Sequence, residues 1–387
     1  MNRNSNWIKV KFEEIVENIT DRIDKPSESG LKYYIGLDQL DTDQIRIKRF
    51  ASTADVNATK FLCKKGDIIF GKRNAYLRKV GISDKDAVVS AHSMVLRPIG
   101  DLIEPEFLPC LLQSSTFWKV AFSVSEGSMS PTIKWKIISQ QEFMIPPKEE
   151  QRKISELLWK IEDNIDKTEK FIEIIQKSRF NFLEGFLRKQ PPLRIDVLGN
   201  VCEKIADRDH TTPKYFSEGP FLISPRNFNG DYEIDFTNAK KISQKAHEKN
   251  KLKTDLKKGD TLFSRIGTIG LVRYLDGPSD YSILHSLVML RPNLNHISSR
   301  YLYHVMNSSI IKNQTSAGVQ SIGVPDLGIN KIREFKIPVY DSKIDSKIVK
   351  DLDLIEQSHK DLLQYYKDIK KLKKKLTDEI LKGNVKI

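Results

Sequence analysis

The segment with the clearest resemblance to a chemical motif lies near position 70. Gly66 to Arg73 approaches the phosphate-binding pattern G-x-x-x-x-G-K-[ST], in which backbone amides cradle phosphate and a hydroxyl binds Mg²⁺. Arg73 stands where the hydroxyl is needed, and the interior is Ile68-Ile69-Phe70, which is typical of a strand. We therefore interpret the segment as a strand followed by a basic turn, not as a nucleotide site.

Other catalytic and metal-binding patterns are missing from the sequence. It contains no H-E-x-x-H, no C-x-x-C, no G-x-G-x-x-G and no Asn-Pro-Pro-aromatic tetrapeptide. Its three cysteines (Cys63, Cys110 and Cys202) are too few and too scattered for a disulfide framework or a zinc site. We expect reduced, buried thiols, no catalytic residues, and no metal bound by this chain.

Basic and polar residues cluster instead in segments predicted to be loops. In the first half these are Lys72, Arg73, Asn74, Tyr76, Arg78 and Lys79. In the second half they are Arg208, His210, Arg226, Asn227, Arg265, Thr268 and Arg273. Arg and Lys side chains can read guanine, and Asn can pair with adenine. These residues predict DNA contacts, although a solvated basic hairpin explains them equally well.

The whole chain is basic. Its 387 residues carry a formal net charge of +13, which favours a polyanionic partner, with nucleic acid ahead of an anionic membrane. No apolar run approaches the roughly 20 residues that span a bilayer, and the polar N-terminus lacks the apolar core of a secretory signal. We expect a cytoplasmic protein of two or three domains without membrane contact.

The sequence is internally duplicated. Lys65 to Lys72 corresponds to Lys258 to Arg265 at an offset of 193 residues, and Leu96-Arg97-Pro98 recurs as Leu290-Arg291-Pro292 at 194. Ile145-Pro146 recurs as Ile337-Pro338. A fixed block order at nearly one offset indicates a tandem duplication. Since the framework blocks match while the loops differ, the two copies are predicted to bind two different ligands of one class.

Each copy ends in a long segment with the 3.5-residue apolar period of a coiled coil. The first, residues 149–189, has the seam Leu158, Ile161, Ile165, Thr168, Ile172, Ile175, Arg179, Phe182 and Phe186. The second, about residues 345–382, has the seam Ile348, Leu352, Ile355, His359, Leu362, Tyr366, Ile369, Lys373, Leu376 and Ile380. Chain connectivity predicts that the helices pair antiparallel, with polar seam residues setting their register.

The predicted fold class is α+β. Two mixed α/β domains, residues 1–148 and 190–340, are expected at opposite ends of a two-helix coiled coil formed by residues 149–189 and 341–387. Within the domains we predict short helices at Phe12–Ile19, Glu106–Phe122 and Arg300–Lys312. Predicted strands include Ile45–Phe50, Gly66–Phe70, Val88–Leu96, Thr261–Phe263 and Leu284–Leu290.

On these residues the chain resembles the specificity subunit of type I restriction–modification systems. The carriers are Lys-Gly-Asp before a strand (Lys65, Lys258), Leu-Arg-Pro (Leu96, Leu290) and Ile145-Pro146-Pro147 with Glu150-Gln151 before the first long helix. The second copy departs from the pattern, because Ile337-Pro338 lacks the second proline and the Glu-Gln pair. The resemblance covers nearly the whole chain.

The resemblance implies a non-catalytic subunit. Each target-recognition domain would read one half of a bipartite double-stranded DNA site, while the helices set the spacing and dock two modification subunits. Those subunits would carry S-adenosylmethionine-dependent methylation, and motor/endonuclease subunits would use ATP and Mg²⁺. A coiled-coil adaptor and a stand-alone DNA-modifying enzyme remain the alternatives.

Overall fold

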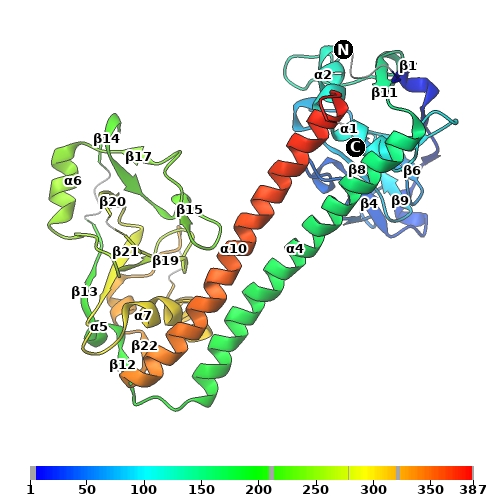
Figure 1. Ribbon diagram of the computed structural model, residues 1–387. Coiled ribbons are helices and arrows are strands. Elements are labelled where there is room, and N and C mark those ends of the chain that lie inside the picture. Colours follow the sequence, from blue (N-terminus) through cyan, green and yellow to red (C-terminus); the bar gives the residue numbers. More distant parts are fainter. Residues whose placement is uncertain (1–5, 209–212, 278, 320–322, 386–387) are drawn as a thin grey trace. The chain divides into compact units, whose positions relative to one another are not determined.

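The structure is a computed structural model that describes residues 6–208, 213–277, 279–319 and 323–385. The chain forms two compact units (Figure 1): unit 1 comprises Met1–Lys170 with Leu363–Ile387, and unit 2 is Phe171–Leu362. Each unit combines a β-rich domain with part of each of two long helices, α4 (Lys148–Lys189) and α10 (Ser342–Leu381). The predicted α+β class with two long helices is confirmed.

Unit 1 is built on two sheets. The four-stranded sheet has the order β2–β10–β7–β8 and is antiparallel, and the five-stranded sheet has the order β3–β6–β9–β4–β5 with β4 parallel to β9. A separate ladder pairs β1 with β11 just before α4. The strands are β1 Ile8–Lys11, β2 Val16–Ile19, β3 Arg22–Ile23, β4 Tyr33–Ile35, β5 Ala51–Ser52, β6 Lys60–Cys63, β7 Ile68–Gly71, β8 Val80–Ile82, β9 Ala87–Val89, β10 Ser93–Pro98 and β11 Glu142–Ile145.

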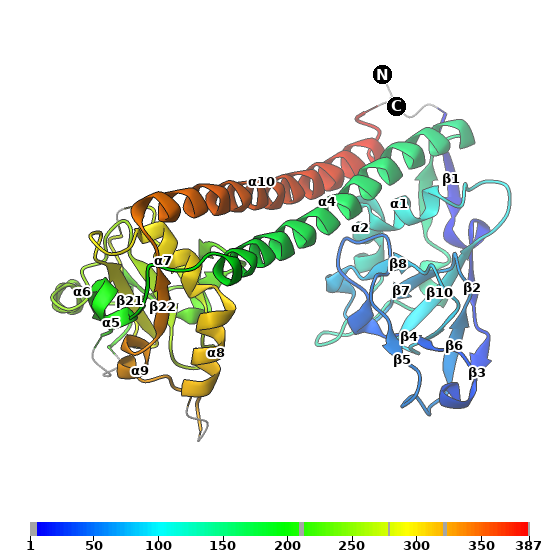
Figure 2. The ribbon, with the colours of Figure 1, turned by 90° about the horizontal axis from the view of Figure 1, so that it is seen from below.

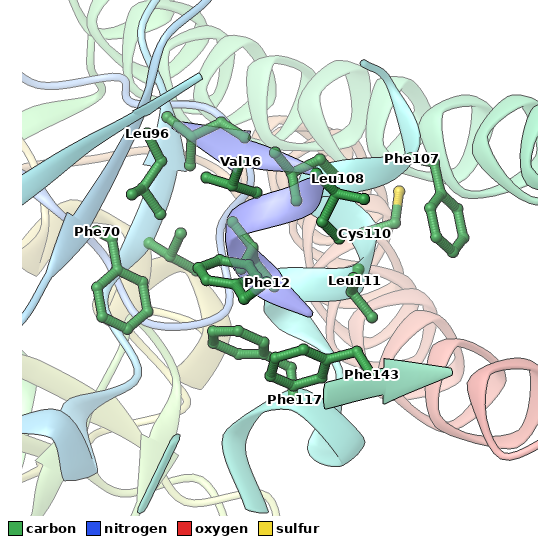
Figure 3. Packing of buried hydrophobic residues seen from close by; sticks show 14 of the residues in the cluster. Phe12, Val16, Phe70, Leu96, Phe107, Leu108, Cys110, Leu111, Phe117 and Phe143 are labelled. Atoms are coloured by element: carbon green, nitrogen blue, oxygen red, sulfur yellow. The ribbon is translucent and has the colours of Figure 1, made fainter. Parts of the chain in front are cut away.

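Aromatic rings fill the main core of unit 1 (Figure 3). Phe12, Phe117 and Phe143 pack with ring centroids 5.3–5.7 Å apart, an arrangement that adds ring–ring attraction to area burial. Phe107, Leu108 and Leu111 reach this core from α1. The helical elements here are α1 Phe107–Gln113, α2 Ser115–Ser123, α3 Trp135–Ile138 and the 3₁₀ turns η1 Phe12–Glu14, η2 Pro26–Glu28, η3 Leu37–Gln39 and η4 Ala75–Leu77.

Unit 2 repeats this framework with a different second sheet. Its antiparallel sheet β13–β21–β18–β19 corresponds in strand order to β2–β10–β7–β8, and β12–β22 corresponds to β1–β11. The second sheet has the order β17–β14–β20. The strands are β12 Arg194–Val197, β13 Cys202–Ala206, β14 Phe216–Ile223, β15 Phe228–Asn229, β16 Glu233–Ile234, β17 Lys240–Lys241, β18 Thr261–Ser264, β19 Val272–Tyr274, β20 Ser282–Ile283, β21 Leu287–Pro292 and β22 Lys336–Val339.

Helices cover the antiparallel sheet of unit 2 as well. Tyr301, Leu302, Val305 and Met306 from one of them are buried in its core. The helical elements are α5 Leu198–Val201, η5 Pro225–Asn227, α6 Gln244–Lys251, α7 Ser299–Met306, α8 Ser309–Gly318 and α9 Ile329–Arg333. Thus each half of the duplication folds a sheet of the same order under two consecutive helices, α1 and α2 or α7 and α8.

The duplicated motifs form one ion pair in each unit, and in both pairs the carboxylate is buried. Asp67 of Lys-Gly-Asp accepts two hydrogen bonds from Arg97 of Leu-Arg-Pro, at 2.8 and 2.9 Å. In unit 2, Asp260 accepts two from Arg291, both at 2.8 Å. Such bidentate pairs fix geometry as well as charge. The two motifs are therefore structural partners that join neighbouring strands.

The long helices run side by side and antiparallel within each unit (Figure 2). Residues late in α4 contact residues early in α10, and residues early in α4 contact residues late in α10. In unit 1 the Nζ atom of Lys373 lies 2.5 Å from Glu162, and in unit 2 Arg179 lies 3.1 Å from Glu356. Lys373 and Arg179 are 194 positions apart, as are Glu356 and Glu162. The polar seam residues therefore pair in a repeated pattern, which pins the register.

Each long helix also anchors a domain helix with its terminal portion. The backbone amide of Ser115 at the start of α2 donates to Asp378 at 2.7 Å, and that of Ser309 at the start of α8 donates to Glu184 at 2.6 Å. Carboxylates are favoured there because helix N-termini carry unpaired N–H groups and partial positive charge. These four residues also follow the 194-residue correspondence.

The predicted seam residues are buried or half-buried, with one exception. Phe182 was placed on the seam but is 40% exposed, whereas its neighbour Leu183 is 4% exposed and packs into the core of unit 2. A straight helix drifts from a strict heptad, so the buried stripe shifts by one position toward the end of α4. In the ranges the structure describes, no helix is long and apolar enough to cross a membrane.

The missing Glu-Gln pair of the second copy has a replacement. In unit 1 the Gln151 side chain accepts from the Glu104 amide at 2.8 Å and donates to Leu102 and Pro146 carbonyls. In unit 2 Asp345 accepts from the amide and hydroxyl of Ser298, at 3.1 and 2.5 Å. The two long helices are thus tied to their domains at equivalent places by different side chains.

Several predicted short elements were wrong. Phe12–Ile19 is a 3₁₀ turn followed by β2 rather than a helix, and Ile45–Phe50 is extended beside β8 without forming a strand. Val88–Leu96 is two strands, β9 and β10, and Glu106–Phe122 is two helices separated at Ser114, which caps α2. The predicted helix Arg300–Lys312 is likewise divided into α7 and α8.

Candidate nucleic-acid interface

Three loops of unit 1 meet at one edge of the antiparallel sheet. We call residues 71–79, 90–93 and 124–134 loop cluster 1. Lys72 joins all three, since its N–H donates to His92 at 3.1 Å and its carbonyl accepts from Ile133 at 2.9 Å. The Ala75 N–H donates to Pro131 at 3.1 Å. The hairpin tip is therefore held by backbone hydrogen bonds on two sides.

Unit 2 has an equivalent arrangement, loop cluster 2, formed by residues 264–271, 284–287 and 323–327. The Arg265 N–H donates to Ser286 at 2.9 Å, and its carbonyl accepts from Leu327 at 2.8 Å. The Gly267 N–H donates to Pro325 at 2.9 Å. Arg265 therefore occupies the place of Lys72.

The predicted contact residues of unit 1 separate into exposed and internal groups. Arg73 and Tyr76 are exposed, and Arg73 Nε donates to Ser130 Oγ at 3.0 Å. Lys72 is half-buried, and burial lowers the pKa of its ammonium. Arg78 and Lys79 donate to backbone carbonyls, at 3.0 Å to Gln113 and 2.5 Å to Leu37.

Asn74 has an internal role as well. Its Oδ1 accepts from Ser130 Oγ at 2.7 Å, and its backbone is left-handed with φ 56°. Asn74, Arg78 and Lys79 thus use their polar atoms to shape loop cluster 1. Arg73 and Tyr76 are the residues of the predicted group that present themselves to solvent there.

In unit 2 the basic residues predicted as base readers are mostly buried. Arg265 is 4% exposed, donates to the carbonyls of Leu327 and His285 at 3.1 Å, and lies 3.3 Å from Asp326. Arg273, also 4% exposed, donates to the carbonyls of Glu233 and Gly230. Both guanidinium groups therefore brace internal carbonyls, and DNA binding by these two arginines stays a prediction.

The remaining predicted residues of unit 2 divide in the same way. Asn227 is buried and bonds to Ser224 and to the Asp235 carbonyl, and Arg208 is buried. Arg226 and Thr268 are exposed. His210 lies outside the described residues. Side-chain type alone could not separate these groups, because the carbonyls that accept from buried arginines come from distant segments.

Loop 124–134 belongs to loop cluster 1, but no residue of it was among the predicted contacts. It contains Met129, which is 95% exposed, followed by Ser130, which bonds to both Arg73 and Asn74. One signal could have found it: Pro131 and Pro325 lie 194 positions apart, the offset of the framework blocks.

The structure offers little for covalent or metal chemistry. The three cysteines are free and buried, and burial raises the pKa of Cys63 to about 11 and of Cys110 and Cys202 to about 12, so the thiols stay protonated at neutral pH. Among residues 6–208, 213–277, 279–319 and 323–385, no three His, Cys, Asp or Glu side chains gather as metal ligands would. The described surface features fit binding.

Comparison with known proteins identifies the architecture. The family described as "Type I restriction modification DNA specificity domain" matches this chain twice, over residues 4–177 and 198–376. The two matches repeat the internal duplication and together span most of the chain.

Two relatives named as specificity subunits share modest identity with it. The putative type I restriction enzyme MjaX specificity subunit of Methanocaldococcus jannaschii is 22% identical over 98% of this chain and 94% of its own length. The type I restriction enzyme HindI specificity subunit of Haemophilus influenzae is 26% identical, over 42% of this chain and 36% of that protein.

Solved structures show the same fold. A chain from a study of complex assembly and conformational transition of the type I R-M system aligns with a TM-score of 0.58 at 18% identity, covering 98% of this chain and 99% of that one. The type I restriction-modification S subunit from M. genitalium aligns with a TM-score of 0.58 at 15% identity, covering 98% and 97%. With the family matching both halves, this chain belongs to the specificity subunits of type I restriction–modification systems, which are non-catalytic.

Proposed function

We propose that each β-rich domain recognises one half of a bipartite double-stranded DNA site through its loop cluster, joined in unit 2 by the exposed Arg226 of η5. The observation that carries this is the pair of loop clusters 1 and 2, which share backbone bonding but differ in the side chains at their tips. A shared scaffold with different tips suits two different short sequences. The net charge of +13 supplies the attraction to phosphate that such a protein requires.

Within this proposal the predicted residues take two roles. Arg73 and Tyr76 in unit 1, and Arg226 and Thr268 in unit 2, contact DNA. Lys72 and Arg265 hold their clusters together, while Asn74, Arg78, Lys79, Asn227 and Arg273 brace neighbouring segments. Phosphate contacts would position the domains, and base-edge contacts would specify the sequence.

The long helices act as spacer and docking surface. Several large apolar side chains of α4 and α10 are exposed, and a soluble helix pair without partners would gain nothing from displaying them. They are Phe171, Ile174, Phe180, Leu354, Tyr365 and Leu372. They suit two modification subunits, which bring S-adenosylmethionine, while motor/endonuclease subunits use ATP and Mg²⁺. Such a complex acts on DNA in the cytoplasm.

The proposal is tested with the full chain reconstituted with its modification subunits. Methylated adenines in the source genome define the site, and affinity is then measured for DNA with either half-site scrambled, at about 150–200 mM salt, where phosphate contacts alone are weak. Arg73→Ala should relax one half-site by about 1–3 kcal/mol of discrimination, and Arg226→Ala the other. Lys25→Ala, a change outside both loop clusters, serves as the control.

Two results would count against the proposal. If both half-sites relax together in either variant, the assignment of one domain to each half is wrong. If the complex binds intact and scrambled sites with equal affinity, the chain is a coiled-coil adaptor, and its net positive charge does not serve sequence recognition. Removing seven residues from each long helix should shorten the preferred spacer while both half-site sequences stay the same.

A further inference from the structure

The hairpin tip of loop cluster 1 holds side chains in a backbone conformation that glycine prefers. Asn74 (φ 56°) and Arg78 (φ 50°) flank the 3₁₀ turn Ala75–Leu77. In loop cluster 2 the corresponding turn contains Gly267 (φ 75°) and Gly270 (φ 93°). Non-glycine residues adopt this conformation only at an energetic cost. The side chains of Asn74 and Arg78 therefore stand where glycine would be less strained.

Those side chains fix the tip to its neighbours. Arg78 Nη2 donates to the Gln113 carbonyl at 3.0 Å, at the end of α1. Asn74 accepts from Ser130 Oγ, which in turn accepts from Arg73 Nε. The tip is thus bonded to the end of a helix on one side and to loop 124–134 on the other. Tyr76, in the middle of the turn, is 59% exposed on this fixed support.

Loop 124–134 is fixed in a similar way and displays an apolar side chain. Glu126 and Thr132 exchange two backbone hydrogen bonds of 3.0 and 2.8 Å, and Pro131 accepts from Ala75. These bonds hold the loop on both sides of Met129, which remains almost fully exposed. Tyr76 and Met129 are therefore exposed on adjoining loops, which Arg73 joins through its bond to Ser130.

Loop cluster 2 differs at both positions, and among its described residues the large apolar side chain that it exposes is Val324, at 68%. Its turn carries Thr268 and Ile269 in place of the longer Ala75–Leu77 turn. Pro325 matches Pro131 through its bond to Gly267, so Gly323 stands in the position of Met129. The exposed Tyr–Met pair is therefore specific to unit 1.

We propose that Tyr76 and Met129 form a wedge that enters and unstacks one base step of double-stranded DNA in the half-site of unit 1. Proteins that kink DNA insert apolar side chains between base pairs while cations enter the minor groove beside them. A wedge must be held rigidly, and the anchored turn and loop meet that need. Arg73 supplies the adjacent cation, and unit 2 reads its half-site without a wedge. This inference rests on the proposed function.

The test uses the reconstituted complex and DNA in which 2-aminopurine replaces one base at a time through both half-sites, with the target adenine left unsubstituted. Fluorescence should rise at least about twofold at one step in the half-site of unit 1, because unstacking removes quenching by neighbouring bases. The double variant Tyr76→Ala/Met129→Ala should lose this rise. It should also bind about tenfold more weakly, a factor equal to 1.4 kcal/mol.

Further variants separate the wedge from the proposed function. Leu294→Ala, an exposed aliphatic residue outside both clusters, should leave the fluorescence unchanged, and Thr268→Ala should leave the signal in the half-site of unit 1 unchanged. If Arg73→Ala relaxes a half-site but no substituted base brightens, or brightening survives in the double variant, the wedge is overturned and the proposed function stands. A complex without sequence preference would overturn both.

Discussion

Unit 1 attaches a recognition-domain segment to the long helices through charge, whereas unit 2 does so through aromatic rings. The segment of unit 1 runs beside β8, where the Ile47 N–H donates to Ile82. From it Arg46 reaches Asp163 and Asp166 of α4, both at 2.6 Å, and Lys48 also contacts Asp166. The guanidinium of Arg46 lies 4.8 Å from the Trp159 ring, which adds a cation–π contact.

The segment of unit 2 runs beside β19 and uses one tyrosine. Tyr232 Oη lies 2.7 Å from Nδ1 of His359 on α10. Arg179 of α4 lies over the rings of Tyr232 and Tyr303, at 5.8 and 5.5 Å. The ion pairs between the helices are repeated in both units, but this link from the segment beside β8 or β19 to the helices is not. The duplication therefore preserved helix register while leaving this one attachment free to change.

The largest expected effect concerns the repeated helix ion pairs. Glu356 is buried and pairs with Arg179, Arg300 and Lys360, whereas Glu162 in unit 1 pairs with Lys373. Burial opposes ionisation of Glu356, but the neighbouring cations hold its pKa below the ordinary value. Glu356→Ala leaves the half-buried Arg179 without its carboxylate and deprives Arg300 of one of its two, Asp353 being the other, and it should cost about 3–5 kcal/mol.

This cost is measured as the free energy of unfolding in urea. Glu162→Ala strands a single lysine and should fall at the lower end of that range, about 3 kcal/mol. Glu149→Ala, an exposed substitution near the start of α4, should change stability by less than about 0.5 kcal/mol. A larger loss for Glu162→Ala than for Glu356→Ala would contradict this ranking.

A smaller effect separates the two modes of attachment. Arg46→Ala removes two partly exposed ion pairs and one cation–π contact and should cost about 1–2 kcal/mol. Because salt screens exposed ion pairs, this cost should shrink between about 0.05 and 1 M NaCl. Tyr232→Phe in unit 2 loses one neutral hydrogen bond, and its cost of about 1 kcal/mol should not depend on salt. Equal salt dependence of the two variants would erase the distinction.

Glycine substitutions at the two hairpin tips should differ by about 1 kcal/mol in their effect on the free energy of unfolding. Gly270→Ala places a side chain at φ 93° and should destabilise unit 2 by about 1–2 kcal/mol. Asn74→Gly relieves the same kind of strain but loses the bond from Ser130, so the two changes nearly cancel. Thermal unfolding of both variants gives the comparison. A large loss for Asn74→Gly would show that its side chain outweighs the strain.

The smallest effect is a difference in pH response. Burial lowers the pKa of His304 and His359 in unit 2, although Asp353 and Asp231 respectively oppose that shift. Arg179 and Glu356 also act on both rings, and Arg300 acts on His304. Because the unfolded chain binds these protons more readily, stability should fall as the pH drops below about 6.5 toward the folded pKa values.

Unit 1 should respond only in stronger acid. Its histidine, His92, is exposed. Burial raises the pKa of Asp166, but Lys48 and Arg46 lower it by more, so the pKa of this carboxyl lies below its ordinary value. That contribution is present above about pH 4 and is lost as the pH falls through the folded pKa. Hydrogen exchange, corrected for intrinsic rates, should therefore increase severalfold in α7 between about pH 7.5 and 5.5 while residues 158–166 change little. Equal increases would remove the contrast.

The sequence predicted the features that repeat over long stretches. The duplication, both long helices and their polar register positions follow from periods that many residues share. Short elements were less predictable. Phe12, Ile15, Val16 and Ile19 have helical spacing, yet the structure buries them in a turn and in β2, because pairing with β10 overrides local pattern.

The candidate site was predictable in location more than in detail. The basic hairpin was identified, but Arg265 and Arg273 were assigned to DNA from their residue type, and both bind carbonyls supplied by segments far away in sequence. Conversely, Met129 is uncharged and belongs to no recognisable motif. Its exposure depends on the backbone hydrogen bonds that hold its loop, which the sequence does not reveal.

The carboxylates at the starts of α2 and α8 limit how the two halves can be exchanged. Asp378, in the last helix of the chain, caps a helix of the first domain, and Glu184, in the helix that follows the first domain, caps a helix of the second. The first residue of that helix in a transplanted domain must therefore donate its N–H to a carboxylate that the recipient's long helix already carries. Because both acids and both serines keep the 194-residue spacing, a cassette that carries the serine is compatible with either position.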